Sequence, residues 1–379
     1  MNFDLTEDQR AIFEAAAAFA RAEMAPHSAR WDEEKHFPVD VLKAAAGLGF
    51  AGIYVGEDVG GSALKRLDAV LIFEALSGGD VSTAAFLSIH NMAAWMIDRF
   101  GAPALREKYL PRLTTMELIA SYCLTEPGAG SDAASLRTMA RREGESYVLN
   151  GAKAFISGAG VSDVYVVMAR SGGDGAAGVS TFVVEKGTPG LSFGAQERKM
   201  GWASQPTAMV HFDNVRIPET SRVGEEGQGF RIAMAGLDGG RLNIAACSLG
   251  GAGLALEAAK SYAESRRQFG RPLRDFQALQ FKLADMATNL EAARLMVRRA
   301  AAALDAGDPA ATGLCAMAKR FATDAGFEIA NQALQIHGGY GYLKDYPLER
   351  IVRDLRVHQI LEGTNEIMRV IIAREMFKP

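Results

Sequence analysis

The order in which hydrophobic periodicity changes along the chain constrains its fold more than any other feature. From Thr6 to about 118, apolar residues recur at helical spacing. From 119 to 229 they form brief β-branched or aromatic runs, and from 230 onward helical spacing returns over longer stretches. Because helices and strands are segregated rather than alternating, the chain is predicted to be an α+β multi-domain protein. We expect an N-terminal helical domain at 1–118, a middle antiparallel β domain at 119–229 and a C-terminal four-helix bundle at 230–379.

Local signals place the elements. Thr6 and Gln9 form a capping box for the first helix, and Pro26 is expected to end it. Asn150-Gly151 after an apolar run indicates a hairpin turn. The other predicted helices cover 39–46, 64–76, 83–100, 104–113, 236–266, 276–306, 309–337 and 365–376. The predicted strands include 147–149, 164–168, 181–184 and 209–212.

Composition argues against several classes of partner. The net charge is −4 and no basic block stands out, so neither nucleic acid nor an anionic membrane is expected as a primary partner. Three widely spaced cysteines without a C-x-x-C pair predict neither a disulfide framework nor a metal site. The longest apolar run, 244–256, is too short to cross a bilayer as a helix. The first residues show no signal-peptide pattern, so a bacterial cytoplasmic location is expected, or the mitochondrial matrix for a processed eukaryotic form.

Glu362 is the strongest candidate for a catalytic group. It follows Ile360 and Leu361 and precedes Gly363. Desolvation by apolar neighbours makes a carboxylate a stronger base, and a glycine lets a ligand approach the backbone. Taken alone, a Glu-Gly pair is more often a solvated turn, because acidic residues are mostly exposed. The hypothesis of a general base therefore depends on the rest of the chain.

Two strings in the middle region could contact a flat heteroaromatic ring. Tyr122 to Asp132 combines glycines and a proline with accessible amides and hydroxyls, and it lacks the lysine of a phosphate loop. Lys153 to Gly158 contains Phe155, which could lie against a ring, and Ser157, which could hydrogen-bond one. Each string by itself is also compatible with an ordinary strand or turn.

Three strings in the C-terminal region could contact phosphate or adenine. Asp238-Gly239-Gly240-Arg241 is expected at the start of a long helix, where Asp238 would complement the helix dipole. The arginines of 265–270 suit a pyrophosphate, although they also fit a helix C-terminus with Gly270 as its stop. In 335–342, paired glycines allow close backbone approach, and His337 has no second metal ligand at the usual spacing.

Together and in this order, these strings resemble the acyl-CoA dehydrogenase family over essentially the whole chain. Tyr122 to Ser131 is similar to the family's flavin-and-substrate loop, and Asp345 to Glu366 to its catalytic segment. Longer strings such as Val184 to Gly194 are most similar to the branch that oxidises short branched-chain acyl groups. Phe155 and Leu361, which stand where many relatives have tryptophan and tyrosine, fit the same branch.

The resemblance implies FAD as cofactor, an acyl-CoA substrate, electron-transfer flavoprotein as electron acceptor and a homotetramer. It implies conversion of isobutyryl-CoA to methacrylyl-CoA, as in valine catabolism, with Glu362 as the base. Gly240 stands where a few subfamilies carry that base. The resemblance assigns substrate contacts to Ser131, Asp238, Arg241 and Gly363. It assigns cofactor contacts, some to a neighbouring subunit, to Tyr122, Leu124, Thr125, Gly130, Ser131, Phe155, Ser157, Arg266, Gln268, Phe269, Phe276, Gln277, Gln335, Gly338, Gly339, Thr364, Asn365 and Glu366.

Two alternatives remain open from the sequence. One is an acyl-CoA oxidase or flavin oxygenase of the same fold, which would differ in its electron acceptor. The other is a relative that binds DNA and no longer dehydrogenates, although a slightly acidic chain disfavours it.

Overall fold

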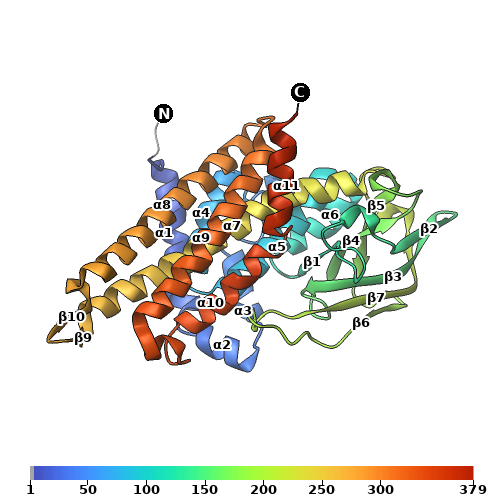
Figure 1. The fold of residues 1–379 in the computed structure, drawn as a ribbon. Coiled ribbons are helices and arrows are strands. Elements are labelled where there is room, and N and C mark those ends of the chain that lie inside the picture. Colours follow the sequence, from blue (N-terminus) through green and yellow to red (C-terminus); the bar gives the residue numbers. More distant parts are fainter. Residues whose placement is uncertain (1–3, 379) are drawn as a thin grey trace.

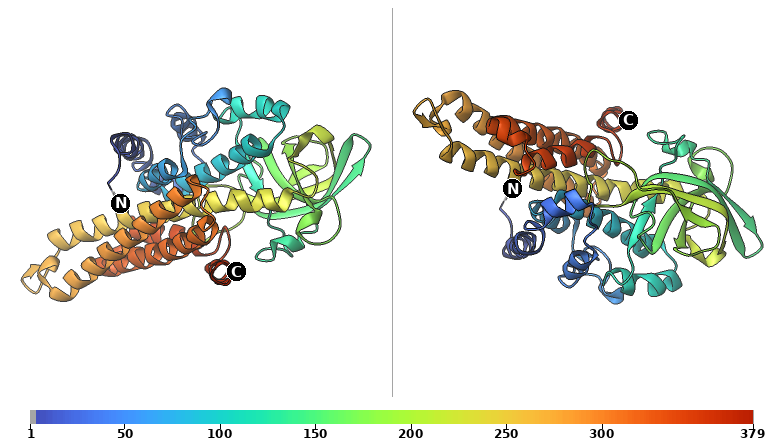
Figure 2. Two further views of the ribbon diagram at one scale, coloured as in Figure 1. Left: turned by 90° about the horizontal axis from the view of Figure 1, so that it is seen from above. Right: turned by 90° about the horizontal axis from the view of Figure 1, so that it is seen from below.

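The computed structural model describes residues 4–378, and helices, strands and helices follow one another as predicted (Figure 1). The strands of the large sheet gather at one end of the molecule, and the long C-terminal helices extend toward the other end. The N-terminal helices lie along one side of these long helices (Figure 2). The predicted fold class is therefore confirmed.

The N-terminal part is helical and matches the predicted elements closely. Its helices are α1 (Glu7–Phe19), α2 (Ser28–Glu34), α3 (Val39–Ala46), α4 (Arg66–Ser77), α5 (Val81–Phe100) and α6 (Pro103–Leu113). The capping box is confirmed, because Thr6 Oγ1 accepts a hydrogen bond from the Gln9 amide at 3.2 Å. Helix α2 was not predicted. It is only seven residues long and is held by the buried Trp31.

The middle part is one eight-stranded sheet in which β1 (Ala120–Cys123) lies off the main path beside β4. The other strands are β2 (Met139–Glu143), β3 (Ser146–Ser157), β4 (Val164–Arg170), β5 (Val179–Glu185), β6 (Leu191–Phe193), β7 (Thr207–Pro218) and β8 (Arg222–Val223). Most strand pairs are antiparallel as predicted. Two pairs are parallel: β1 with β4, and β2 with β4, which pair at a single position. The sheet is therefore mixed. Parallel neighbours need a long crossover, which the β2–β3 hairpin provides here.

The hairpin predicted at Asn150-Gly151 is wrong. Strand β3 runs straight through this pair, and its register with β7 shifts between Leu149 and Gly151, which marks a bulge. Gly151 has φ 144°, and a Cβ there would lie 2.7 Å from Thr138 Cα. The turn falls earlier, at Gly144 (φ 62°) between the paired Glu143 and Ser146. The glycine signal was real, but it marked close approach of a neighbouring strand.

The C-terminal part is built on three long helices. These are α7 (Gly229–Ser265), α8 (Gln277–Asp305) and α9 (Ala311–His337), followed by the shorter α10 (Leu348–Arg356) and α11 (Asn365–Met376). The short strands β9 (Arg267–Gln268) and β10 (Arg271–Pro272) form a separate ribbon after α7. Helix α7 is long and apolar enough to cross a membrane, but 72% of its most apolar stretch is buried inside the protein. It packs against α4, α5, α8 and α9 and is the central core helix.

The start of α7 corrects one prediction. The helix begins at Gly229 rather than at 236, so Asp238 and Arg241 lie in its third and fourth turns and not at its N-terminus. The proposed helix-dipole role of Asp238 is therefore wrong. The cluster of glycines at 236–240 looked like a helix start, but these residues are buried where other segments approach the helix closely.

Candidate active site

Glu362 lies in the short connection between α10 and α11. Its backbone is left-handed, with φ 53°, a conformation that few residues other than glycine adopt and that costs about 1–3 kcal/mol. Thr364 then caps α11, since its Oγ1 accepts a hydrogen bond from the Ile367 amide at 3.3 Å. The backbone N–H of Glu362 donates to no acceptor within residues 4–378. This connection thus presents both a carboxylate and a free amide.

The environment of Glu362 favours a proton-accepting role. The residue as a whole is partly exposed, but its carboxylate oxygen Oε2 is buried and has no hydrogen-bond partner among the described residues. Burial raises the pKa of this carboxyl to about 7, while the charges of Lys319 and Arg241 act in the opposite direction. The burial of the carboxylate, not that of the whole residue, sets this pKa, because solvation of the charged atoms determines it. A carboxyl with a pKa near 7 is suited to accept a proton at neutral pH.

Gly240 of α7 provides the space for this carboxylate. A Cβ at position 240 would lie 2.5 Å from Glu362 Oε2 and 3.0 Å from Met92 Sδ. Any side chain here would displace the acid, so the glycine is required by close approach. The two positions considered for a base, 240 and 362, therefore meet at one place, and only Glu362 supplies a carboxylate there.

Arg241 and Asp238 form a buried pair beside the same connection. Arg241 Nη1 lies 2.6 Å from Asp238 Oδ1, and Asp238 Oδ2 accepts a hydrogen bond from Thr312 at 2.9 Å. Arg241 Nε donates to the backbone carbonyl of Glu362 at 3.2 Å. In this structure the pair holds the Glu362 main chain in place, and Arg241 has its charge compensated by Asp238.

Tyr122 on β1 faces the same region. Its hydroxyl is buried and has no partner within the described part of the chain. Burial raises the pKa of Tyr122, and the charge of Glu362 raises it further. Unpartnered buried polar atoms are rare in folded proteins and need an explanation. Tyr122 Oη and Glu362 Oε2 are two such atoms, and a polar ligand could partner either of them.

The loop after β1 is anchored on β3. Lys153 is fully buried and donates to Glu126 Oε1 at 2.7 Å and to the Leu124 carbonyl at 3.0 Å. Glu126 also accepts the backbone N–H groups of Arg137 and Thr138. This buried ion pair fixes the first half of the predicted flavin loop.

The same contacts bring most of the predicted ring-binding residues together. The Ala154 amide donates to the Thr125 carbonyl at 2.8 Å, which places Thr125 next to Phe155. Phe155 is 68% exposed in a left-handed conformation (φ 57°), and Gly130 and Ser131 are also exposed. Ser157 is partly buried, and its carbonyl accepts a hydrogen bond from Ser121. An exposed aromatic side chain beside open glycines is what a flat ring ligand would require.

A second group of predicted residues lies elsewhere. Arg266, Gln268, Gly338 and Gly339 line a pocket of about 380 Å³ at the far end of α7, together with Tyr262, Leu273, Ile336, His337, Tyr340 and Leu343. The rings of Tyr262 and His337 are stacked there, with centroids 4.2 Å apart. Phe269 is 93% exposed, and its ring contacts that of Phe276. Phe276 and Gln277 lie at the start of α8, and Gln335 is exposed near the end of α9.

The two groups are too far apart to form one site within a single chain. Arg241 and Arg266 lie at the two ends of a continuous helical stretch of 25 residues, which spans about 38 Å at 1.5 Å per residue. Figure 1 shows the same separation between the ribbon of β9 and β10 and the large sheet. The structure therefore brings the Glu362 group together and leaves the Arg266 group at a distance.

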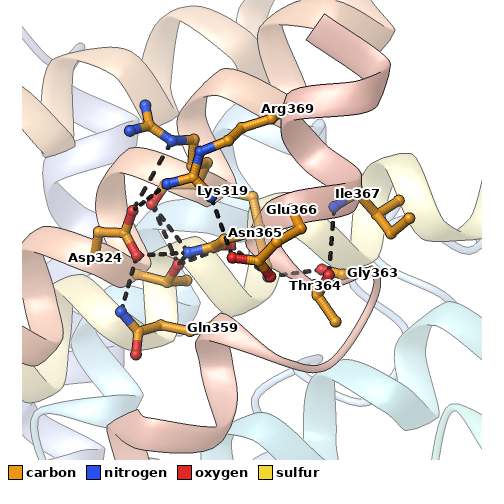
Figure 3. A network of polar contacts seen from close by, with 11 residues as sticks. Lys319, Asp324, Gln359, Gly363, Thr364, Asn365, Glu366, Ile367 and Arg369 are labelled. Atoms are coloured by element: carbon orange, nitrogen blue, oxygen red, sulfur yellow. Dashed lines mark hydrogen bonds and ion pairs between the residues drawn. The ribbon is translucent and has the colours of Figure 1, made fainter. Parts of the chain in front are cut away.

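Figure 3 shows a contact that sequence reasoning missed. Lys319 of α9 is fully buried and donates to the Gly363 carbonyl and to Asn365 Oδ1, both at 2.9 Å. Asn365, predicted to contact the cofactor, has its side chain occupied by this network, and Glu366 is exposed. The signal in the sequence was a lysine directly after the apolar stretch Cys315 to Ala318 of a helix. Nothing local shows that its charge faces an acid more than forty residues later.

Comparison with known families identifies this arrangement. Three models of the acyl-CoA dehydrogenase family match successive parts of the chain. The N-terminal domain model matches residues 6–117, the middle domain model 121–215 and the C-terminal domain model 227–377. Mitochondrial isobutyryl-CoA dehydrogenases of Bos taurus and Dictyostelium discoideum are each 58% identical to it, over 99% of this chain and 90% of theirs. The chain belongs to the acyl-CoA dehydrogenase family.

Solved structures agree with this assignment. Butyryl-CoA dehydrogenase from Megasphaera elsdenii superposes with a TM-score of 0.97 at 38% identity, with both chains covered completely. PigA in complex with FAD and proline gives 0.97 at 34% identity, with 99% of each chain covered. A chain solved in work on the electron-transferring flavoprotein of Acidaminococcus fermentans gives 0.97 at 42% identity, again with complete coverage of both.

Proposed function

We propose that the protein is an FAD-dependent acyl-CoA dehydrogenase that removes two hydrogens from a short branched acyl thioester, with isobutyryl-CoA as the preferred substrate and Glu362 as the base. One observation carries this proposal: a buried, unpartnered carboxylate lies beside Gly240, in a connection whose backbone carbonyl accepts a hydrogen bond from Arg241. The family and the 58% identity to isobutyryl-CoA dehydrogenases support the reaction and the substrate class.

The residues present fit the cofactor. Thr125, Gly130, Ser131, Phe155 and Ser157 offer an exposed aromatic face, open amides and hydroxyls for the isoalloxazine end. The pocket with Arg266, Gln268 and the glycines at 338 and 339 offers a cation and open backbone for the dinucleotide end. When bound, FAD would supply the acceptor for the β-hydrogen of the substrate.

The protein's own contribution is to bind, orient and deprotonate. The free amide of Glu362 is available to donate to the thioester oxygen, which stabilises the negative charge that develops there. The Glu362 carboxylate, with its pKa near 7, takes the α-proton. Arg241 holds the Glu362 carbonyl, and burial of the site excludes water from the reacting carbons.

The separation of the two residue groups supports an oligomer. Arg241, which contacts the Glu362 carbonyl, and Arg266 are separated by about 38 Å of helix α7, so the Arg266 group lies far from the Glu362 group of its own chain. We therefore propose that the Arg266 group of one subunit completes the cofactor site of another, in a homotetramer. We also propose electron-transfer flavoprotein as the acceptor and a bacterial cytoplasmic location, both of which stay predictions.

Anaerobic flavin reduction tests the proposal directly. Glu362→Gln keeps the size of the side chain and removes its basicity, so the FAD-loaded variant should bind isobutyryl-CoA without bleaching. Glu107→Gln, an exposed acid on α6, is the matched control and should bleach at the unmodified rate. Rapid bleaching by Glu362→Gln would show that another group removes the proton. Stoichiometric peroxide with oxygen as sole acceptor would instead favour an acyl-CoA oxidase.

The substrate assignment needs a panel of thioesters. Isobutyryl-CoA should give the highest kcat/KM, with 2-methylbutyryl-, butyryl- and propionyl-CoA as weaker substrates. One methylene in an apolar pocket discriminates by only about 10–200-fold, so overlap is expected. A preference for octanoyl-CoA or longer chains would contradict the assignment.

A further inference from the structure

Lys319 contacts the main chain on the C-terminal side of Glu362. Its ammonium group donates to the carbonyl of Gly363, the residue after Glu362, at 2.9 Å, and to Asn365 Oδ1 at the same distance (Figure 3). Both acceptors are neutral oxygens. The lysine projects from α9, whereas its partners belong to the connection and first turn that lead into α11. One buried side chain therefore links the C-terminal core to the segment that carries the base.

Lys319 is a buried cation of this site that has no carboxylate in contact. Within residues 4–378 no carboxylate lies within 4.0 Å of its ammonium group, whereas Arg241 is paired with Asp238 at 2.6 Å. An unpaired buried charge is destabilising unless something offsets it. Burial lowers the pKa of Lys319 to about 8, while the negative charge of Glu362 acts to raise it. The lysine is therefore charged at neutral pH, and among the acids around it Glu362 has the largest effect on its pKa.

The network around Asn365 fixes the segment on α9. Asn365 Nδ2 donates to Asp324 Oδ1 at 2.7 Å and to Thr323 Oγ1 at 2.9 Å, and Gln359 donates to the same Asp324 oxygen at 2.8 Å. Figure 3 shows these contacts on both sides of the connection. Because Glu362 is held in a left-handed conformation, its flanks have to be anchored for the carboxylate to keep one direction.

We propose that Lys319 is a positioning residue for Glu362, which it serves in two ways. It holds the backbone that aims the carboxylate, and its unpaired charge favours the ionised form of the base. This inference deepens the proposed function and rests on Glu362 being the base. It assigns Lys319 no contact with substrate or cofactor.

Arg241 also acts to lower the pKa of Glu362, but less than Lys319 does. Burial raises the pKa values of the nearby thiol and phenols, so these are neutral at pH 7. Arg241 is charged, but Asp238 offsets it. The titratable and charged groups concerned are Lys319 from α9, Arg241 and Cys247 from α7, Tyr122 from β1, and Tyr54 from the connection between α3 and α4. Arg66 of α4 lies behind Tyr54, with its guanidinium 3.7 Å from the centre of the Tyr54 ring.

Two variants separate charge from anchoring. Lys319→Met removes the cation and both hydrogen bonds, whereas Asn365→Ala removes one anchor and leaves the cation. The readout is the second-order rate of anaerobic flavin reduction by isobutyryl-CoA, measured from pH 5.5 to 9 on FAD-loaded protein. In Lys319→Met the midpoint of the profile should rise by about one pH unit, as expected when an opposite charge is lost from a carboxylate. In Asn365→Ala the plateau should fall while the midpoint does not rise.

Further variants keep the inference testable. Lys319→Arg should return the midpoint toward that of the unmodified protein, because it restores a cation. If Lys319→Met does not fold, Asn365→Asp offers the same test, since its carboxylate would offset the lysine charge at the same place. The inference is overturned if the midpoint stays unchanged in Lys319→Met, or if Asn365→Ala raises it equally. Failure of the base assignment is distinguishable, because Glu362→Gln would then still bleach.

Discussion

The pKa of Glu362 predicts how the rate of flavin reduction depends on pH. Only the ionised carboxylate can accept the α-proton, and burial places its pKa at about 7 instead of the ordinary 4.5. The ionised fraction is then about one tenth at pH 6, one half at pH 7 and nine tenths at pH 8. The second-order rate of reduction should therefore rise about tenfold between pH 6 and pH 8 and level off above.

Stopped-flow absorbance under anaerobic conditions measures this profile. At low substrate concentration the second-order rate reports the free protein, to which the pKa refers. A control with dithionite establishes that the flavin can be reduced at every pH. A rate that is flat between pH 6 and 8, or a midpoint near 4.5, would refute the reasoning, because either result means that the base is solvated or lies elsewhere.

Three further predictions follow from the same structure. Because the pKa of Glu362 is raised in the folded state, ionisation of this carboxylate lowers the free energy of unfolding as the pH rises from 4.5 to 7. Glu362→Gln does not ionise and avoids this loss. Denaturant titration should therefore find the variant, relative to the unmodified protein, up to about 3 kcal/mol more stable at pH 8 than at pH 5. Glu362→Gln and Arg266→Glu should each be inactive alone. After the two variants are mixed and exchange subunits, about a quarter of the sites should be active, because an intact site takes Glu362 from one chain and Arg266 from another. No recovery of activity despite confirmed exchange would contradict a shared site. Lys153→Met leaves Glu126 buried and unpaired, which costs about 3–5 kcal/mol, so FAD should dissociate more readily in equilibrium dialysis; unchanged retention would contradict the anchoring role of the pair.

Much of the fold was readable because the signals were local. The capping box at Thr6, helix α3 and helix α11 are specified by residues within a few positions of each other, and the structure confirms them. The errors arose where a local signal had a distant cause. Gly151 looked like a turn residue but accommodates Thr138 of a neighbouring segment. The glycines at 239 and 240 looked like a helix start but lie against Arg66 and Glu362.

The sequence by itself determined the order of helices and strands, the family and the identity of Glu362 as the candidate base. These depend on periodicity and on strings of adjacent residues. Only the tertiary structure decided the pKa of that acid, because its burial and the charges around it come from groups far apart in the chain. Lys319 and Arg241 approach Glu362 from two different helices, and Gly240 makes room for it. The contact of Arg241 with the Glu362 carbonyl, which places the Glu362 group at one end of this part of α7 and Arg266 at the other, likewise joins residues 121 positions apart and is not visible in any local pattern.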